Sequence, residues 1–201
     1  MRNKKLTLAI LAGLLVSFAM PAVADGTEVL GPPIGLEIQE GSGIVAAGTG
    51  TVPVGSTNYI DIEVPAGATV NQVILYWAGE TLLPSQGDDT ITVNGNEVVG
   101  ALIGGPTFFF TFQGEVYYSA FRADITSLAL VGPGMNMLTI EDMAFAHFNN
   151  GVGVLVIYDD GTGLSRIDIR DGVDLAFAFF PEPRKTTIPQ TFDIGAAAVE
   201  R

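Results

Sequence analysis

The hydrophobic positions along the chain recur at the short intervals that are typical of β-strands. Val152 to Tyr158 and Val70 to Ala78 are apolar on both pleat faces, and a strand of that kind belongs in the middle of a core. Tyr59 to Val64 instead alternates between apolar and acidic residues, as a strand with one wet face does. The pattern therefore predicts two central strands and at least one half-exposed strand.

Turn residues divide the rest of the chain into similar short runs. Asn94-Gly95 predicts a hairpin over Thr90 to Val99, because both residues accept the positive φ that a two-residue turn requires. Ser165 to Arg170 alternates strictly, and we expect it to pair with Val152 to Tyr158 across the loop Asp159 to Gly163. Further strands are expected at Leu36–Glu40, Ile44–Ala47, Phe108–Phe112, Val116–Phe121, Met137–Ile140 and Leu175–Phe180.

About a dozen short strands with turn signals between them predict an all-β fold, an antiparallel β-sandwich or jelly roll. A helical turn is expected only at Asp124 to Leu128. The chain has no internal repeat and no second hydrophobic block after a linker, so we predict a flexible lead-in at 25–34 and one domain at 35–201. Ile194 to Arg201 carries no turn, cap or anchor, which suggests that the domain is incomplete at this end or that a later domain has been lost.

The first 24 residues have the three parts of a secretory signal peptide. Basic residues precede the apolar segment Leu6 to Met20, and Ala22-Val23-Ala24 supplies a small-x-small cleavage site. The apolar run is shorter than the roughly 20 residues that span a bilayer, which favours cleavage after Ala24 over a membrane anchor. We therefore predict a secreted, extracellular or cell-surface protein with no membrane insertion after cleavage.

Charge and composition narrow the classes of partner. Cleavage would leave six of the nine Lys and Arg residues against all 22 Asp and Glu residues, a net charge of −16. Such a chain cannot replace the counterions of a nucleic acid, and anionic membrane surfaces repel it. The chain has no cysteine and one histidine, which argues against zinc and most redox chemistry. Without disulfides the fold has to be held by its core, by metal or by neighbours, and at this size the core alone is sufficient.

Acidic loops are the candidate metal sites. Asp159 and Asp160 offer carboxylates on a glycine-bearing loop that suits calcium, although a turn satisfied by its own backbone is the favoured interpretation. The stretch Gln86 to Asp89 is a weaker candidate of the same kind. Asp168, Asp171 and Asp174 would have to be brought together by a bend in the chain.

Catalytic and ligand-binding candidates are few. His147 is the only histidine, and no nucleophile elbow accompanies it, so we predict no enzyme and a structural histidine. Lys185 is the only lysine outside the signal peptide and would be the donor of any Lys–Asn crosslink. Tyr117 and Tyr118 are neighbours on one strand, so one ring must point outward and could contact a sugar. Trp77 lies within a central strand and is interpreted as a core residue.

Three stretches together resemble a domain of unknown function found in exported bacterial and archaeal surface proteins. They are Pro65 to Gly79, Tyr118 to Thr126, and Gly153 to Asp174, where Arg166, Ile167, Asp171 and Gly172 fit the family pattern. The resemblance covers about residues 64–198 and implies a secreted β-rich module that is often part of a longer surface chain. It implies no catalytic residues.

Two functions follow as hypotheses, and a third, a hydrolase, has no motif behind it. The leading one is a non-enzymatic, secreted or cell-surface β-sandwich module with a structural or adhesive role. The alternative is a carbohydrate-binding module that uses exposed aromatic rings, with or without bound calcium.

Overall fold

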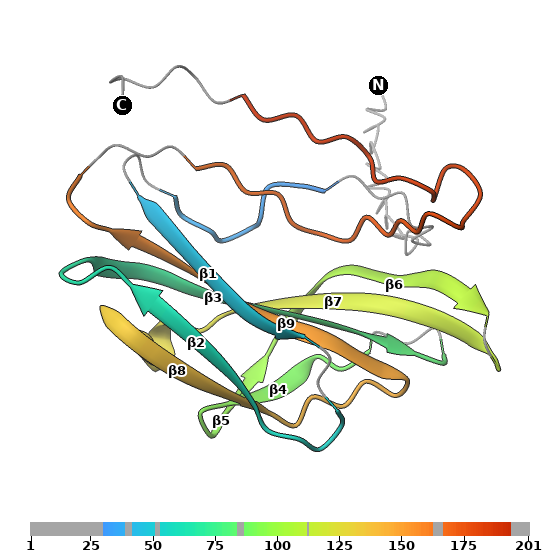
Figure 1. Cartoon of the computed structure of the whole chain (residues 1–201), viewed down its shortest axis with the longest axis horizontal. Helices are drawn as coiled ribbons and strands as arrows, with labels where there is room; N and C mark the ends of the chain where they lie inside the picture. The colour runs from blue at the N-terminus through green and yellow to red at the C-terminus, as the bar shows by residue number, and fades with distance from the viewer. Residues whose placement is uncertain are drawn as a thin grey trace, which may run out of the picture.

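The computed structural model describes residues 30–38, 42–50, 53–83, 87–111, 113–162 and 167–193. The predicted signal peptide, with Ala22 and Ala24, lies outside the described residues, as does the first part of the lead-in. The described chain forms two antiparallel β-sheets that face each other, which confirms the predicted all-β sandwich (Figure 1). Within these ranges, the structure has no helix with the length and hydrophobicity to cross a membrane.

Nine strands make up the two sheets. The larger sheet has the order β1 (Gly43–Gly50), β9 (Phe148–Asp159), β3 (Thr69–Thr81), β7 (Glu115–Asp124) and β6 (Ala101–Thr111). The smaller sheet has the order β2 (Asn58–Val64), β8 (Gly134–Glu141), β4 (Thr90–Val93) and β5 (Asn96–Val99). If β6 is set aside and the other strands are renumbered, the orders become 1-8-3-6 and 2-7-4-5, the arrangement of a jelly roll.

The main core lies between the two sheets, where the inward faces of the central strands meet. Leu75 and Trp77 of β3 and Val154 and Val156 of β9 belong to one buried cluster, as predicted. The Trp77 ring is 2% exposed, and its Nε1 donates a hydrogen bond to the backbone oxygen of Asp88 at 2.8 Å. The only tryptophan is therefore a core residue.

Two local features, a hairpin turn and a helical turn, also form where the sequence predicts them. Asn94 and Gly95 have φ of 47° and 75°, so the β4–β5 hairpin turns on these two residues, as predicted. The Asn94 side chain also accepts a hydrogen bond from the Thr139 backbone N–H at 2.6 Å, which ties the turn to β8. The expected helical turn is the 3₁₀ helix η1 (Thr126–Leu128).

The predicted partner of the central strand β9 is wrong. Both edges of β9 are occupied, one by β1 and the other by β3, and residues 167–170 form no strand. Residues 165–166 lie outside the described chain. The predicted strand at Leu175–Phe180 is also absent, and residues 36–38 of the expected strand Leu36–Glu40 are not in a sheet. Because β9 is apolar on both faces, its outer face needs a cover, and these segments lie along the outer side of the five-stranded sheet (Figure 1).

Candidate functional site

Two extended segments cover the outer face of the five-stranded sheet. We call residues 30–38 the N-terminal strap and residues 167–174 the C-terminal strap. Figure 1 shows them, in blue and orange, on the side of the sheet that faces away from β2 and β8. Gly31 and Asp171 join the straps through two backbone hydrogen bonds of 3.0 and 2.9 Å. The straps form a third, partial layer on the sandwich.

Apolar and amide contacts hold the straps to the sheet. Ile74 and Ile157, which point away from the main core, are only 1% and 0% exposed. A Cβ on Gly104 of β6 would lie 2.5 Å from Cγ2 of Val173, so the glycine makes room for the C-terminal strap. The Gln72 side chain binds the N-terminal strap through the Glu37 N–H at 2.7 Å and the Gly35 oxygen at 3.1 Å.

A charged cluster fixes the place where the straps meet. Arg122 of β7 forms an ion pair with Asp171, and their side chains are only 12% and 14% exposed. The Tyr76 hydroxyl of β3 donates to the same carboxylate at 3.5 Å, and Arg122 also donates to the Ile34 oxygen. Burial, followed by the charge of Asp171, raises the pKa of Tyr76. The cluster is a structural clamp, because its polar groups bind one another.

Sequence reasoning missed this clamp. The sequence pattern marks Asp171 as an acidic metal candidate and gives Arg122 no role, because a contact between residues 49 positions apart leaves no local pattern. One feature of the sequence nevertheless pointed to the clamp. Tyr76, Arg122 and Asp171 each come from a different one of the three stretches on which the family resemblance rests.

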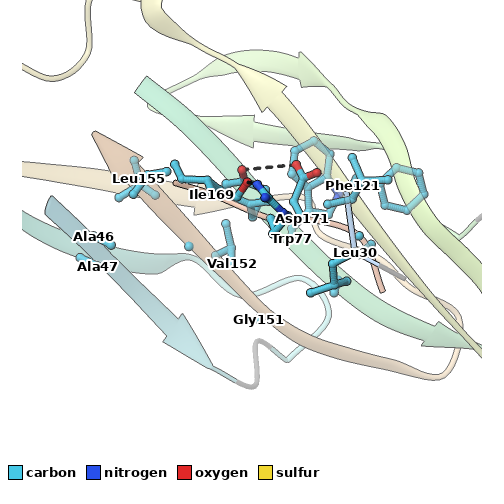
Figure 2. A pocket seen from close by; sticks show the side chains of 18 residues that line it. Leu30, Ala46, Ala47, Trp77, Phe121, Gly151, Val152, Leu155, Ile169 and Asp171 are labelled. Atoms are coloured by element: carbon cyan, nitrogen blue, oxygen red, sulfur yellow. Dashed lines mark hydrogen bonds between the residues drawn. The ribbon is translucent and has the colours of Figure 1, made fainter. Parts of the chain in front are cut away.

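A cleft of about 520 Å³ remains open beside the straps (Figure 2). Its lining is mainly apolar, and its floor consists of very small residues on β1, β3, β7 and β9: Ala46, Ala78, Ala120, Gly151 and Gly153. Leu30 and Ile169 of the straps contribute to its walls, and Asp171 of the clamp also borders it. The absence of side-chain bulk on the floor leaves this space between sheet and straps.

An exposed group of phenylalanines forms the second candidate surface. The aromatic surface consists of Phe109 and Phe110 of β6 together with Phe177, Phe179 and Phe180. Phe177 is 45% and Phe179 is 86% exposed, whereas the Arg184 guanidinium lies 5.1 Å from the Phe180 ring centre. The residue pattern predicts a strand at Leu175–Phe180 and gives no indication of this surface. Three phenylalanines among the four residues before Pro181 were the available signal.

The predicted calcium ligands cap their own turn. The Asp159 carboxylate accepts a hydrogen bond from the Gly161 N–H at 2.7 Å, and Asp160 accepts from the Thr162 N–H at 2.9 Å. The Thr162 hydroxyl bond is the main cause of a lowered pKa of Asp160. These contacts match the favoured interpretation of a self-satisfied acidic turn. In the described parts of the chain, no three His, Asp or Glu side chains gather as metal ligands would, and calcium binding stays a prediction.

The other acidic candidates lie apart from one another. Asp168 pairs with Arg170, Asp171 with Arg122, and Asp174 accepts a hydrogen bond from the Ile188 N–H. Asp88 binds the Ala144 N–H at 2.6 Å, and burial raises its pKa. Gln86 lies outside the described residues. The bend that would bring Asp168, Asp171 and Asp174 onto one ion is not observed.

Tyr117 and Tyr118 are separated by the pleat of β7. The Tyr117 hydroxyl donates to the Glu115 carboxylate, and its ring packs edge-on against Phe108 at 6.0 Å. Tyr118 lies on the opposite face near Glu80, and burial raises its pKa. The two rings are both half-buried and form no shared platform, so their ligand-binding role stays a prediction.

His147 lies beside a buried carboxylate. Its Nε2 is 3.8 Å from Oε2 of Glu80, a residue that is 7% exposed, and its backbone N–H donates to the backbone carbonyl oxygen of Glu80 at 2.9 Å. The Asn150 side chain donates to the same carboxylate at 3.3 Å. No serine hydroxyl binds His147 within the described ranges, and Lys185 lies exposed in a loop.

We expect the free energy of unfolding to fall as the pH rises above about 10. The pKa values of Tyr76 and Tyr118 are both raised in the folded state, chiefly by burial. Stability that is fully present below the ordinary tyrosine pKa is lost as the pH rises toward the raised values, because only the unfolded chain releases these protons readily. Urea titrations at about pH 9 and about pH 11 measure the loss.

The matched variant for this effect is Tyr76→Phe combined with Tyr118→Phe, which removes both phenols. It should lose less stability than the wild type between the two pH values, whereas Tyr59→Phe, at a 56% exposed position, should behave as the wild type does. An equal loss in all three proteins would show that the buried phenols do not contribute.

No protein-family model, curated protein sequence or solved structure matches the chain.

Proposed function

We propose that the chain is an exported, non-enzymatic β-sandwich module with a structural or adhesive role outside the cell, and that the aromatic surface is where it adheres. The observation that carries the proposal is the exposure of Phe177 and Phe179, at 45% and 86%. Clustered exposed rings on a strongly acidic chain are typical of an interaction surface. Burying them against a partner is favourable by about 25 cal/mol for each Å² of apolar surface that is removed from water.

The form of the surface favours an apolar protein partner over a polysaccharide. Phe177 and Phe179 meet at an interplanar angle of 61°, and Phe109 and Phe180 at 87°, so neighbouring rings do not build a flat platform for sugar stacking. None of the five rings carries a hydroxyl group that could hydrogen-bond a sugar. Aromatic side chains are, by contrast, common energetic centres of protein–protein interfaces.

Adhesion can be measured as retention of the mature chain, coupled to beads, on envelope material from the cells that produce it. Replacement of both exposed rings, Phe177→Ser with Phe179→Ser, should reduce retention by about tenfold or more. The control is Met135→Ser with Met137→Ser on β8, which removes two apolar side chains of similar exposure, 68% and 56%, from the other sheet. Retention of the control should equal that of the wild type.

Two further measurements separate the adhesive hypothesis from the carbohydrate-binding one. Soluble polysaccharide should not compete with retention, and chelation of calcium should leave it unchanged. Competition by polysaccharide, with no effect of the phenylalanine substitutions, would replace the adhesive role with the carbohydrate-binding alternative. Equal retention of all variants would show that the aromatic surface does not adhere.

A further inference from the structure

In the described parts of the chain, the two sheets have four edges that pair with no further strand, and three of these edges carry features that prevent pairing. β2 presents Asp61 and Glu63, and the four-residue β5 contains Glu97. β6 contains Pro106 and three register shifts against β7. Charges, short length, proline and bulges are the usual means by which a sheet edge avoids another strand. These three edges are therefore closed to strand addition.

The edge of β1 has none of these features. Its eight residues contain no charge and no proline, and they pair with β9 without a register shift from Gly43–Tyr158 to Gly50–Gly151. On the other side of β1, no backbone hydrogen bond is made by any described residue. Alternate N–H and C=O groups of β1 therefore point outward in a straight row, which is a template for one more strand.

We propose that the edge of β1 is an interface between two copies of this chain, which pair β1 with β1 in antiparallel orientation about a two-fold axis. The five-stranded sheets would then join into one continuous sheet of ten strands. Charge supports a second copy as the occupant. Two mature chains, each with a net charge of −16 after the predicted cleavage, repel each other at most surfaces, and β1 is a contact at which no like charges are opposed. The proposal does not depend on the adhesive role.

Side-chain size supports self-pairing in either central register. Opposed residues of an antiparallel pair share a face, so the two-fold axis passes either through the Ala46 pair or through the Ala47 pair. Ile44 then lies opposite Gly48 of the second copy in the first register and opposite Gly50 in the second. In both registers the largest exposed side chain of β1, with 41% exposure, meets a glycine.

The cleft supplies the space that receives Ile44. Within one copy Gly48 is opposite Gly153, and Gly50 is opposite Gly151. Gly151 and Gly153 belong to the cleft floor, and Figure 2 shows Ala46 and Ala47 of β1 on the side of the cleft opposite Leu30 and Asp171. Ile44 of each copy would therefore be buried at the open side of the other copy's cleft.

Cysteine crosslinking tests the interface directly, because the natural chain has no cysteine. Opposed Cα atoms in an antiparallel pair lie about 4.5–5.5 Å apart, within the range that a disulfide bridges. Ala46→Cys and Ala47→Cys should identify the register, and Met137→Cys, a 56% exposed position on β8, is the control. At about 0.15 M salt, which screens repulsion, one of the two β1 variants should form a disulfide dimer about tenfold faster than the control.

Sedimentation equilibrium gives the second readout. The mature wild-type chain should be a dimer at about 100 μM, Ile44→Glu should be a monomer of unchanged melting temperature, and Met137→Glu, with the same added charge, should remain a dimer. The Phe177→Ser, Phe179→Ser protein should also remain a dimer, which separates this interface from the aromatic surface. A wild-type chain that is monomeric at about 1 mM overturns the proposal. So does a dimer that Ile44→Glu leaves intact.

Discussion

Trp77→Ala should lower the free energy of unfolding by about 3–5 kcal/mol, a large part of the 5–15 kcal/mol that is typical of a folded domain. The indole is 2% exposed and stacks on Phe121 with ring centres 5.9 Å apart. It also packs against Gly100, and its N–H is bound to the Asp88 oxygen. Alanine would leave a cavity between the sheets and an acceptor without its donor, and the chain has no disulfide to limit the loss.

Urea titration of the mature protein measures this effect. Phe179→Ala removes another aromatic ring, but at a position that is 86% exposed, and should change stability by less than about 0.5 kcal/mol. Similar losses in the two variants would contradict the assignment of Trp77 to the core. An unchanged Trp77→Ala protein that had lost binding to a glycan would instead support the carbohydrate-binding hypothesis.

Arg122→Met should cost about 3 kcal/mol, because it leaves the largely buried Asp171 carboxylate without its cation. Arg122 also binds the Ile34 oxygen, so both straps lose a contact in this variant. Limited proteolysis should then cleave the straps faster than in the wild type, because a detached segment is a better substrate. Stability and proteolysis together measure how strongly the clamp holds the straps.

The matched control is Arg170→Met. Its partner Asp168 is 32% exposed and Arg170 itself 24%, so the loss should stay below about 1 kcal/mol. Combining Arg122→Met with Asp171→Asn should recover part of the lost stability, since no unpaired charge then remains buried. If the double variant is no more stable than Arg122→Met, the charge of Asp171 is not the cause of the loss.

The sequence predicted those parts of the fold that depend on local pattern. The two-faced apolar runs placed β3 and β9 at the centre of the sheet, and Asn94-Gly95 placed the β4–β5 hairpin. The partner of β9 could not be predicted in this way. Alternation in Ser165 to Arg170 shows that one face is buried, but a strap that lies across a sheet buries one face as well as an edge strand does.

The candidate surfaces were harder to predict, because they depend on contacts between distant segments. The clamp joins Tyr76, Arg122 and Asp171 from three parts of the chain, and the aromatic surface joins β6 to residues 177–180. Composition gave no weight to the glycines and alanines of the cleft floor, since small residues carry no chemistry of their own. Tyr117 and Tyr118 were selected because they are aromatic neighbours, although the pleat separates them.

Amide hydrogen exchange along β1 tests the proposed pairing of two copies without knowledge of any external partner. In dilute mature protein, alternate amides of β1 should be protected by β9, and the amides between them should exchange almost as fast as in an unfolded chain. In concentrated protein, the fast amides should slow by about tenfold or more as copies pair. Protection of all β1 amides in dilute solution, or no slowing on concentration, would contradict the pairing of β1 with β1.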